Sequence, residues 1–370
     1  MKKKVLAVLL GGCMVAGLVA GCGGSKDKAD EGKKDDAGKD GGYHYEVVVK
    51  SFQSTYWQAA LQGIAQAEEA LGVTTNATGP NAESDIADQV NMLNNAINQK
   101  PDGIALAACD QKSVIESLQK ALDAEIPVVC FDTGVPDAPE GSVYATVVTN
   151  NEVAGALAAE NMYETIKDTI AKADKPVRIG EVNQDATSAN ISGRGMGFIN
   201  KMKELIEKDG KTVAVIGNQF YVDQVENNGK EADADVIIEV AVPAQTTVEL
   251  SATEASNIMN KEDTIAIFGS NQVTAEGLLT ANQNLSVLAT DPAKGIVAVG
   301  FDAGATVKAA VKDSVLLGAV TQAPVDQGRI AIETLYKINK GEEVSDTETA
   351  CYWYNAENME NEEIAPNLYD

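Results

Sequence analysis

Residues 103–132, GIALAACDQKSVIESLQKALDAEIPVVCFD, decide the fold of this chain. The apolar runs Gly103–Ala107 and Val128–Phe131 have the length and composition of buried strands. Between them, apolar residues recur about one helical turn apart from Val114 onward. A strand, a helix and a second strand in this order predict two parallel strands joined by a crossover helix, so the segment indicates an α/β fold.

The same alternation continues along the chain and restarts after Asn150. The part from Tyr43 onward exceeds the length at which one core usually splits, so two lobes in tandem are expected. Each lobe should have a parallel sheet with helices on both faces. The predicted strands are Tyr45–Lys50, Val73–Ala77, Gly103–Ala107, Val128–Phe131, Val177–Val182, Thr212–Ile216, Val236–Val242, Thr264–Phe268, Ile296–Phe301 and Leu316–Val320.

Composition and net charge indicate which kinds of molecule are not expected as partners of this protein. The chain is 44% hydrophobic and 23% charged, as in an ordinary globular protein, and its formal net charge is −26. Such a negative field repels polyanions, so no nucleic-acid partner is expected.

The first twenty-two residues have the order of a secretion signal. Basic residues 2–4 precede an apolar run from Val5 to Ala20, and the small residue Gly21 then precedes Cys22. This order resembles a bacterial lipoprotein signal, in which cleavage leaves a lipidated cysteine first. A membrane-spanning anchor is the alternative, but about 20 uninterrupted apolar residues are needed and glycines interrupt this run.

We therefore expect a signal peptide at 1–21 and a lipidated, disordered linker at 22–42, with the lipid on Cys22. The linker is almost only Gly, Lys, Asp, Glu, Ala and Ser, a composition that cannot repay the cost of ordering. These features predict an extracytoplasmic protein, anchored by its lipid to the outer face of the bacterial cell membrane.

Polar or aromatic residues follow nearly all the predicted strands, where open α/β sheets bind ligands. Aromatic faces suit the C–H faces of a sugar ring, and carboxylates or amides suit its hydroxyls. Each candidate also has a structural alternative, such as capping a helix for Asp and Asn or pairing with a surface carboxylate for Arg. The candidates are Tyr56, Trp57, Asp132, Arg194, Asn271, Asp302 and Gln322.

The candidate residues lie in a series of short motifs. These are STYWQAALQG from Ser54, VVCFD ending at Asp132, RGMGF from Arg194, FGSN ending at Asn271, VGFD ending at Asp302, and VTQAPVDQG containing Gln322. In this order the motifs resemble those of the type I periplasmic sugar-binding proteins, especially the ribose-binding group. The resemblance covers roughly Tyr45 to Val344.

This resemblance implies two Rossmann-like lobes joined by a three-segment hinge, with 43–149 and 323–348 in the N-terminal lobe and 150–322 and 349–370 in the C-terminal lobe. It implies a monomeric solute-binding lipoprotein of an ABC importer, without a cofactor or metal, which closes on a monosaccharide or similar polyhydroxylated ligand and delivers it to a membrane permease. Tyr56 and Trp57 would sandwich the ring. The other implied ligand contacts are Ser54, Asp132, Arg194, Asn271, Asp302 and Gln322.

Some positions depart from the ribose-binding pattern and leave alternatives open. Thr133 and Ala107 stand where that pattern has Arg and Asn. The segment 184–192 is one residue longer, so Ser192 or Asn190 could take the place of Arg194. A polyol, a nucleoside or a furanosyl signal is an alternative ligand, and a ligand-sensing receptor is an alternative role.

Catalysis is not expected. His44 is the single histidine, so the sequence lacks a Ser/His/Asp triad, and it also lacks a Gly-Lys-Ser/Thr phosphate loop. A sugar-responsive transcription regulator shares this core but would need a basic DNA-reading module before it. After cleavage of the signal peptide, the chain would keep three cysteines other than Cys22, namely Cys109, Cys130 and Cys351. A disulfide between Cys109 and Cys130 is conceivable, but buried free thiols are favoured.

Overall fold

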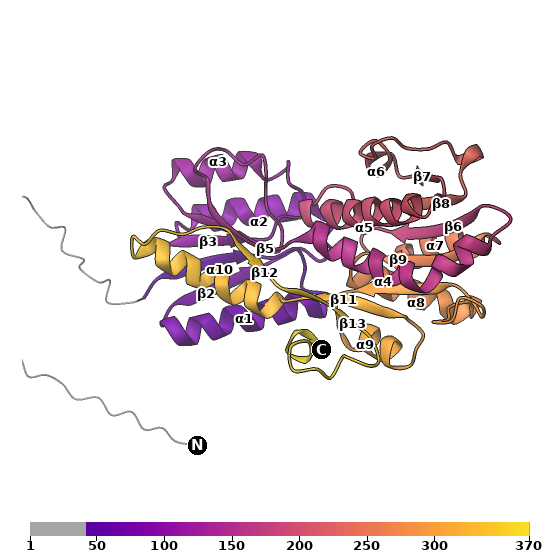
Figure 1. Ribbon diagram of the computed structural model, residues 1–370. Helices are drawn as coiled ribbons and strands as arrows, with labels where there is room; N and C mark the ends of the chain where they lie inside the picture. Colours follow the sequence, from indigo (N-terminus) through magenta and orange to yellow (C-terminus); the bar gives the residue numbers. More distant parts are fainter. Residues whose placement is uncertain (1–41, 370) are drawn as a thin grey trace, which may run out of the picture. The chain divides into compact units, whose positions relative to one another are not determined.

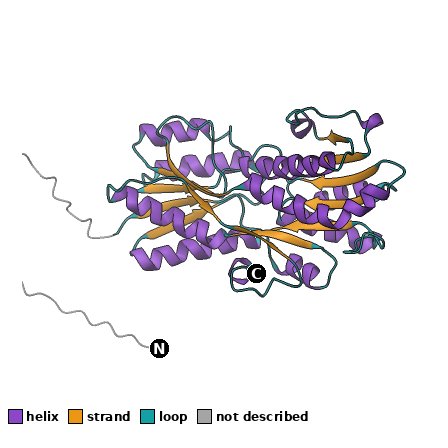
Figure 2. Ribbon diagram, viewed as in Figure 1, coloured by secondary structure: helices purple, strands orange, loops and turns teal. Residues whose placement is uncertain are grey.

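The computed structural model describes residues 42–369 (Figures 1 and 2). The predicted signal peptide, Cys22 and all but the last residue of the predicted linker lie outside these residues. None of the helices between residues 42 and 369 combines the length and apolar character that a bilayer-spanning helix requires.

The first lobe contains a six-stranded sheet whose neighbouring strands are all parallel. Its strands, in spatial order, are β12 (Thr347–Thr349), β5 (Val143–Thr149), β4 (Val128–Phe131), β3 (Gly103–Leu106), β1 (His44–Val48) and β2 (Thr74–Thr78). Helices α1 (Thr55–Leu71) and α10 (Pro324–Asn339) pack on one face, and α2 (Ile86–Asn98) and α3 (Ile115–Asp123) on the other. In β1, Val47 and Val48 point to opposite faces and both are buried, because helices cover both sides of the sheet.

The second lobe contains a seven-stranded sheet. Its strands, in spatial order, are β13 (Cys351–Tyr354), β11 (Gly318–Gln322), β10 (Val297–Phe301), β9 (Thr264–Gly269), β6 (Val177–Val182), β8 (Val236–Ala241) and β7 (Val213–Gly217). The edge strand β13 runs antiparallel to β11, and the other pairs are parallel. The predicted α/β class with two Rossmann-like lobes is confirmed, with one antiparallel edge that the sequence did not indicate.

Helices again cover both faces of the second sheet (Figure 2). One face carries α4 (Asn151–Lys172) and α5 (Ala189–Lys208), and the other carries α7 (Val248–Met259), α8 (Gln272–Leu285) and α9 (Ala305–Lys312). The short helix α6 (Gln219–Val222) follows β7. Gly155 allows α4 and α5 to approach closely, because a Cβ at this position would overlap the Arg194 carbonyl oxygen. This contact fixes the helix that carries Arg194.

The chain passes between the two sheets at three places within residues 42–369. One residue separates β5 from α4, one separates β11 from α10, and one separates β12 from β13. Hydrogen bonds tie these crossings together: Gln327 Nε2 lies 2.9 Å from Thr149 Oγ1 and 3.0 Å from Thr349 Oγ1, and Thr149 Oγ1 donates to Gln322 Oε1 at 3.0 Å.

Candidate ligand-binding site

The residues that the sequence analysis selected lie together at the carboxyl ends of the strands of both lobes. They line one cavity of about 20 Å³, which has room for about one water molecule. A sugar ring can therefore enter only if the lobes or the lining side chains move apart. The cavity is lined by Ser54, Tyr56, Trp57, Asp132, Arg194, Asn271, Asp302 and Gln322, together with residues that the sequence analysis did not select.

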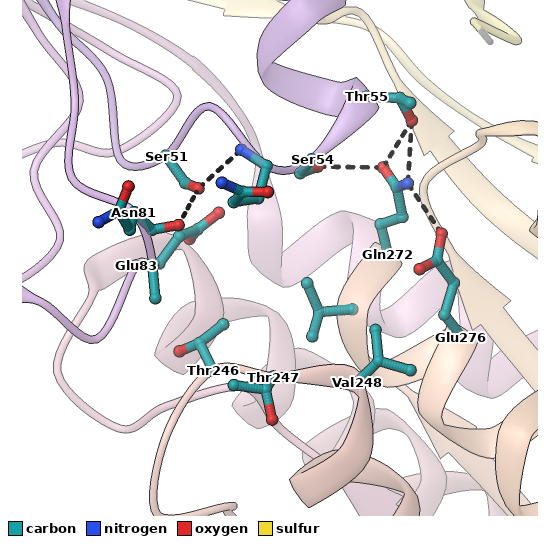
Figure 3. A pocket seen from close by; sticks show the side chains of 13 residues that line it. Ser51, Ser54, Thr55, Asn81, Glu83, Thr246, Thr247, Val248, Gln272 and Glu276 are labelled. Carbon is teal, nitrogen blue, oxygen red and sulfur yellow. Dashed lines mark hydrogen bonds between the residues drawn. The ribbon is translucent and has the colours of Figure 1, made fainter.

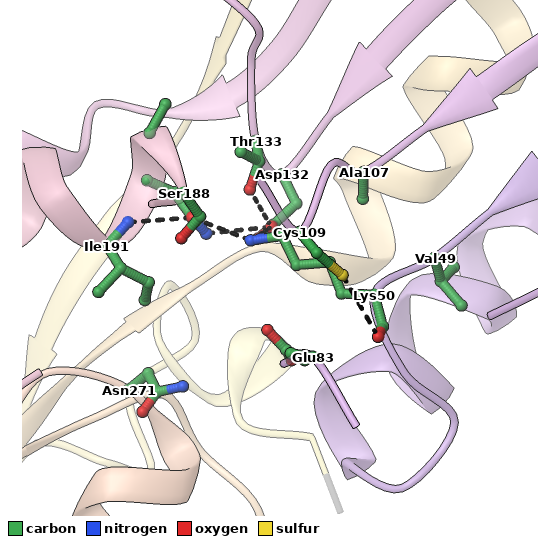
Figure 4. Close-up of polar contacts among 12 residues, drawn as sticks. Val49, Lys50, Glu83, Ala107, Cys109, Asp132, Thr133, Ser188, Ile191 and Asn271 are labelled. Atoms are coloured by element: carbon green, nitrogen blue, oxygen red, sulfur yellow. Dashed lines mark hydrogen bonds and ion pairs between the residues drawn. The ribbon is translucent and has the colours of Figure 1, made fainter. Parts of the chain in front are cut away.

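Asp132 follows β4 and holds its carboxylate among side chains from both lobes (Figure 4). The Tyr56 hydroxyl lies 2.6 Å from Oδ1, while the Thr133 hydroxyl and Asn190 Nδ2 donate to Oδ2 at 2.7 and 3.0 Å. Its φ of 59° is a left-handed conformation that a non-glycine residue adopts only at a cost. The next regular element is the strand β5, so Asp132 does not cap a helix, which was its structural alternative.

Lys50 is a site residue that the sequence analysis missed. Its side chain is 1% exposed, and Nζ lies 3.3 Å from Asp132 Oδ2 and donates to Asn190 Oδ1 at 3.0 Å. Burial lowers the lysine pKa, but the charges of Asp132, Glu83 and Asp185 outweigh it, so the pKa is raised and the ammonium stays charged. Lys50 brings a positive charge to Asp132 where Thr133 replaces the arginine of the ribose-binding pattern.

Asp302 is the corresponding carboxylate of the second lobe. Its Oδ1 accepts from Gln322 Nε2 at 2.7 Å, and Oδ2 accepts from the backbone N–H of Gln272 at 3.0 Å. Burial raises the pKa of this carboxyl, against the charge of Arg194 and these two hydrogen bonds. Because α9 has Gly304 as its N-cap, Asp302 does not cap the helix that follows it.

Arg194 also lines the cavity, but protein atoms engage its guanidinium. Nε and Nη2 donate to Asn151 Oδ1 at 3.1 and 2.7 Å, and Nη1 donates to the Ser270 carbonyl oxygen at 2.8 Å. The guanidinium carbon lies 3.6 Å from the centre of the Phe301 ring, a cation–π contact. The alternative of a surface ion pair is wrong, since Arg194 is 1% exposed.

The two alternatives to Arg194 differ from each other. Helix α5 begins at Ala189, and this start places Asn190 between Lys50 and Asp132. Ser192 instead donates to the Ser188 carbonyl oxygen of its own helix at 2.8 Å. Both Asn190 and Arg194 therefore line the cavity, and Ser192 does not.

Tyr56 and Trp57 open helix α1, whose N-cap is Ser54. Their ring centres are 5.0 Å apart and the rings are nearly perpendicular, at 88°. Because the rings pack against each other, they do not enclose a sugar ring between them in this conformation. Trp57 Nε1 donates to Glu83 Oε1 at 2.7 Å, and Gln184 Nε2 of the other lobe donates to Glu83 Oε2 at 2.7 Å.

Asn271 and Gln322 have structural roles as well as places in the cavity wall. Asn271 is the N-cap of α8 and forms a reciprocal capping box with Thr274, so the helix-capping role that the sequence analysis gave as its alternative is confirmed. Its Nδ2 also donates to Gln184 Oε1. Gln322 is the last residue of β11 and joins Asp302 to the crossing residue Thr149.

The described cysteines are free thiols, so the conceivable Cys109–Cys130 disulfide is not formed. Both of these residues are buried, as the favoured interpretation expected. Burial raises the pKa of Cys130 to about 12, so this thiol is unreactive at neutral pH.

Comparison with known proteins places this geometry in a family. The sequence profile of the periplasmic binding protein domain matches residues 45–343. The chain belongs to the periplasmic binding protein family. The predicted resemblance to type I periplasmic sugar-binding proteins is thus confirmed, and membership in a family of binding proteins agrees with the prediction that the chain is not an enzyme.

Several individual proteins are similar to this chain, with sequence identities between 24% and 30%. The ribose import binding protein of Salmonella typhimurium is 24% identical over 64% of this chain and 64% of its own length. The chain thus aligns with under two thirds of that relative. A structure titled ABC transporter, LacI family transcriptional regulator, from Brachyspira murdochii, is 30% identical with a TM-score of 0.73, covering 90% of this chain and 100% of its own. An ABC transporter solute-binding protein from Agrobacterium vitis with bound D-fucose is 27% identical with a TM-score of 0.72, covering 88% and 100%.

Proposed function

We propose that this periplasmic binding protein captures a sugar ring, or a similar small polyhydroxylated molecule, between its lobes and delivers it to the permease of an ABC importer. The observation that carries the proposal is the common cavity of Asp132 and Asp302, which follow strands of different lobes. Relatives named for ribose import and bound to D-fucose support a sugar as the ligand.

The charges of the cavity favour a neutral ligand. Lys50 is paired with Asp132, and Arg194 is engaged by Asn151 and Ser270, so neither cation is left for a phosphate or carboxylate. Carboxylates accept hydrogen bonds from hydroxyls, and each bond to a charged group contributes about 1.5 to 3 kcal/mol. A few such bonds would give selectivity for one arrangement of hydroxyls.

Capture would proceed by hinge closure, with 43–149 and 323–348 moving as one lobe and 150–322 and 349–370 as the other. The open form would admit the ring, and closure would bring Asn190 to Lys50 and Asp132 from the other side of the cleft. The mechanism requires the walls of the cavity of about 20 Å³ to separate for a ring to enter, and its lining side chains to leave more room once the ring is bound.

Residues 1–42 supply the remaining part of the proposal. Lipidation at Cys22 would hold a monomeric protein at the outer face of the cell membrane, beside the permease, and the linker would allow the folded part to reach it. The order of residues in 1–22 supports this part of the proposal.

Thermal unfolding of the purified protein with pentoses, hexoses, polyols and nucleosides tests the function. A ligand at a hundredfold excess over its Kd should stabilise the folded state by about 2.7 kcal/mol. Asp302→Ala should abolish the shift, whereas Asp313→Ala, an exposed carboxylate in the same lobe, should keep it. If no compound of the panel shifts the transition, the proposal is wrong.

A further inference from the structure

A second, larger pocket opens beside the cavity described above (Figure 3). This outer pocket has a volume of about 440 Å³, within the range of about 300 to 1,000 Å³ that small-molecule sites occupy. Residues 51, 53–55 and 81–83 of the first lobe line it, as do 246–248, 272, 273 and 276 of the second. Both lobes thus form its walls.

The outer pocket adjoins the inner cavity. Ser54, Glu83, Gln272 and Val273 line both spaces. Asp132 and Asp302 line the inner cavity and not the outer pocket, so the shared residues lie at the border of the two spaces. A molecule with one end at the two aspartates could therefore continue into the outer pocket.

Hydrogen bonds across the cleft give the outer pocket a fixed edge. Gln272 Oε1 accepts from Ser54 Oγ at 3.2 Å, and Gln272 Nε2 donates to Thr55 Oγ1 at 2.9 Å and to Glu276 Oε1 at 2.9 Å. These bonds join the start of α1 to the start of α8 (Figure 3). The closed arrangement of the lobes therefore completes the outer pocket and does not fill it.

The lining groups suit hydroxyls better than charged groups. Among residues 42–369, the side chains of Gln53, Asn81 and Thr246 have no hydrogen-bond partner, so they are available to a ligand. Glu83 and Glu276 are the ionisable residues of the lining, and their negative charge disfavours an anionic substituent. Val248 and Val273 offer apolar surface to the C–H face of a ring.

We propose that the outer pocket is a second subsite, and that the ligand is a neutral disaccharide or glycoside. One ring occupies the inner cavity after its walls have moved apart, and a second hydroxylated unit contacts Asn81, Thr246 and Gln53 in the outer pocket. This inference rests on the proposed function, because it takes the inner cavity as a sugar site. It changes the ligand class from a single ring to a sugar that carries a further polar unit.

Titration calorimetry with monosaccharides and the disaccharides built from them tests the inference. The protein should bind at least one disaccharide at least tenfold more tightly than its component monosaccharides. Asn81→Phe and Thr246→Phe fill the outer pocket and should weaken that disaccharide at least tenfold, while the monosaccharide Kd stays within twofold. Gln245→Phe, at an exposed position beside the pocket, is the matched control and should change neither affinity.

Two results would overturn the inference of a second subsite, and only one of them would also overturn the proposed function. If a monosaccharide binds as tightly as every disaccharide and Asn81→Phe changes nothing, the outer pocket is only the solvated mouth of the cleft, and the proposed function stands. If neither class of sugar binds, both the second subsite and the proposed function fail. Circular dichroism of each variant before titration separates these results from misfolding.

Discussion

A buried carboxyl group in the second lobe gives the sharpest test of the electrostatics. Glu181 lies in β6 with no exposed surface, and its Oε1 accepts from Asn183 Nδ2 at 2.7 Å. Its Oε2 and Asn183 Oδ1 have no partner. Burial raises the pKa of Glu181 well above its ordinary value of 4.5, and the hydrogen bond from Asn183 opposes this only in part. A proton on Oε2 would remove the charge that burial disfavours.

The predicted perturbation is Glu181→Gln, which keeps the shape and places an N–H where that proton would lie. In the wild type the folded protein keeps the proton, while the unfolded chain releases it above pH 4.5. Stability from this group is therefore complete below pH 4.5 and falls by about 1.4 kcal/mol per pH unit above it, until the folded-state pKa is reached. Between pH 5 and the folded-state pKa, the variant should therefore gain stability relative to the wild type by about 1.4 kcal/mol per pH unit.

Urea unfolding at pH 5, 6 and 7 measures this difference in the free energy of unfolding. Glu226→Gln, at an exposed position of the same lobe, is the control and should show a small difference without this slope. A difference between Glu181→Gln and wild type that stays constant with pH would show that Glu181 is ionised in the folded state, and the reasoning would be refuted.

Two further predictions concern the site and the packing behind it. Lys50→Met should lower the free energy of unfolding, measured in urea, by about 3 to 5 kcal/mol, because it leaves Asp132 buried without its cation. The double variant with Asp132→Asn should regain most of that stability without regaining ligand binding. A Lys50→Met variant as stable as the wild type would contradict the buried pair. Gly155→Ala should lower the free energy of unfolding by about 1 to 3 kcal/mol, because its Cβ would overlap the Arg194 carbonyl oxygen. At the control position Gly193, an added Cβ would have its nearest neighbour at 3.7 Å, so Gly193→Ala should stabilise the helix by up to about 1 kcal/mol. Equal effects of the two substitutions would exclude the steric argument.

The sequence predicted the strands that a continuous apolar run of residues marks locally. The strands Val128–Phe131 and Val177–Val182 have the predicted bounds, because each is a continuous apolar run between turn residues. Strand β5 was missed, since a loop without a helix precedes it and the expected alternation of strand and helix breaks there. Its residues alternate between buried and partly exposed positions, which weakens the apolar signal.

The site was predicted where strand ends determine it. Asp132 and Asp302 meet because parallel strands bring their carboxyl ends to one edge of each sheet. The sequence analysis did not select Lys50, because it is the last residue of the predicted first strand and lysine is rarely buried. Glu83 lies in the irregular segment between β2 and α2, where no periodic pattern locates a side chain. The contacts of Arg194 with Asn151 and Ser270 depend on tertiary packing that residue types do not specify.

The three crossings between the sheets have a consequence for the energetics of capture. Since each is one residue long and the amide of Gln327 holds hydroxyls from two of them, sliding and twisting of one half on the other are restrained. The proposed hinge closure would then be close to a swing about a single axis. Occupancy of the cleft would have to freeze only that one angle instead of many independent torsions, so little conformational entropy would be lost and most of the contact energy would be retained as affinity.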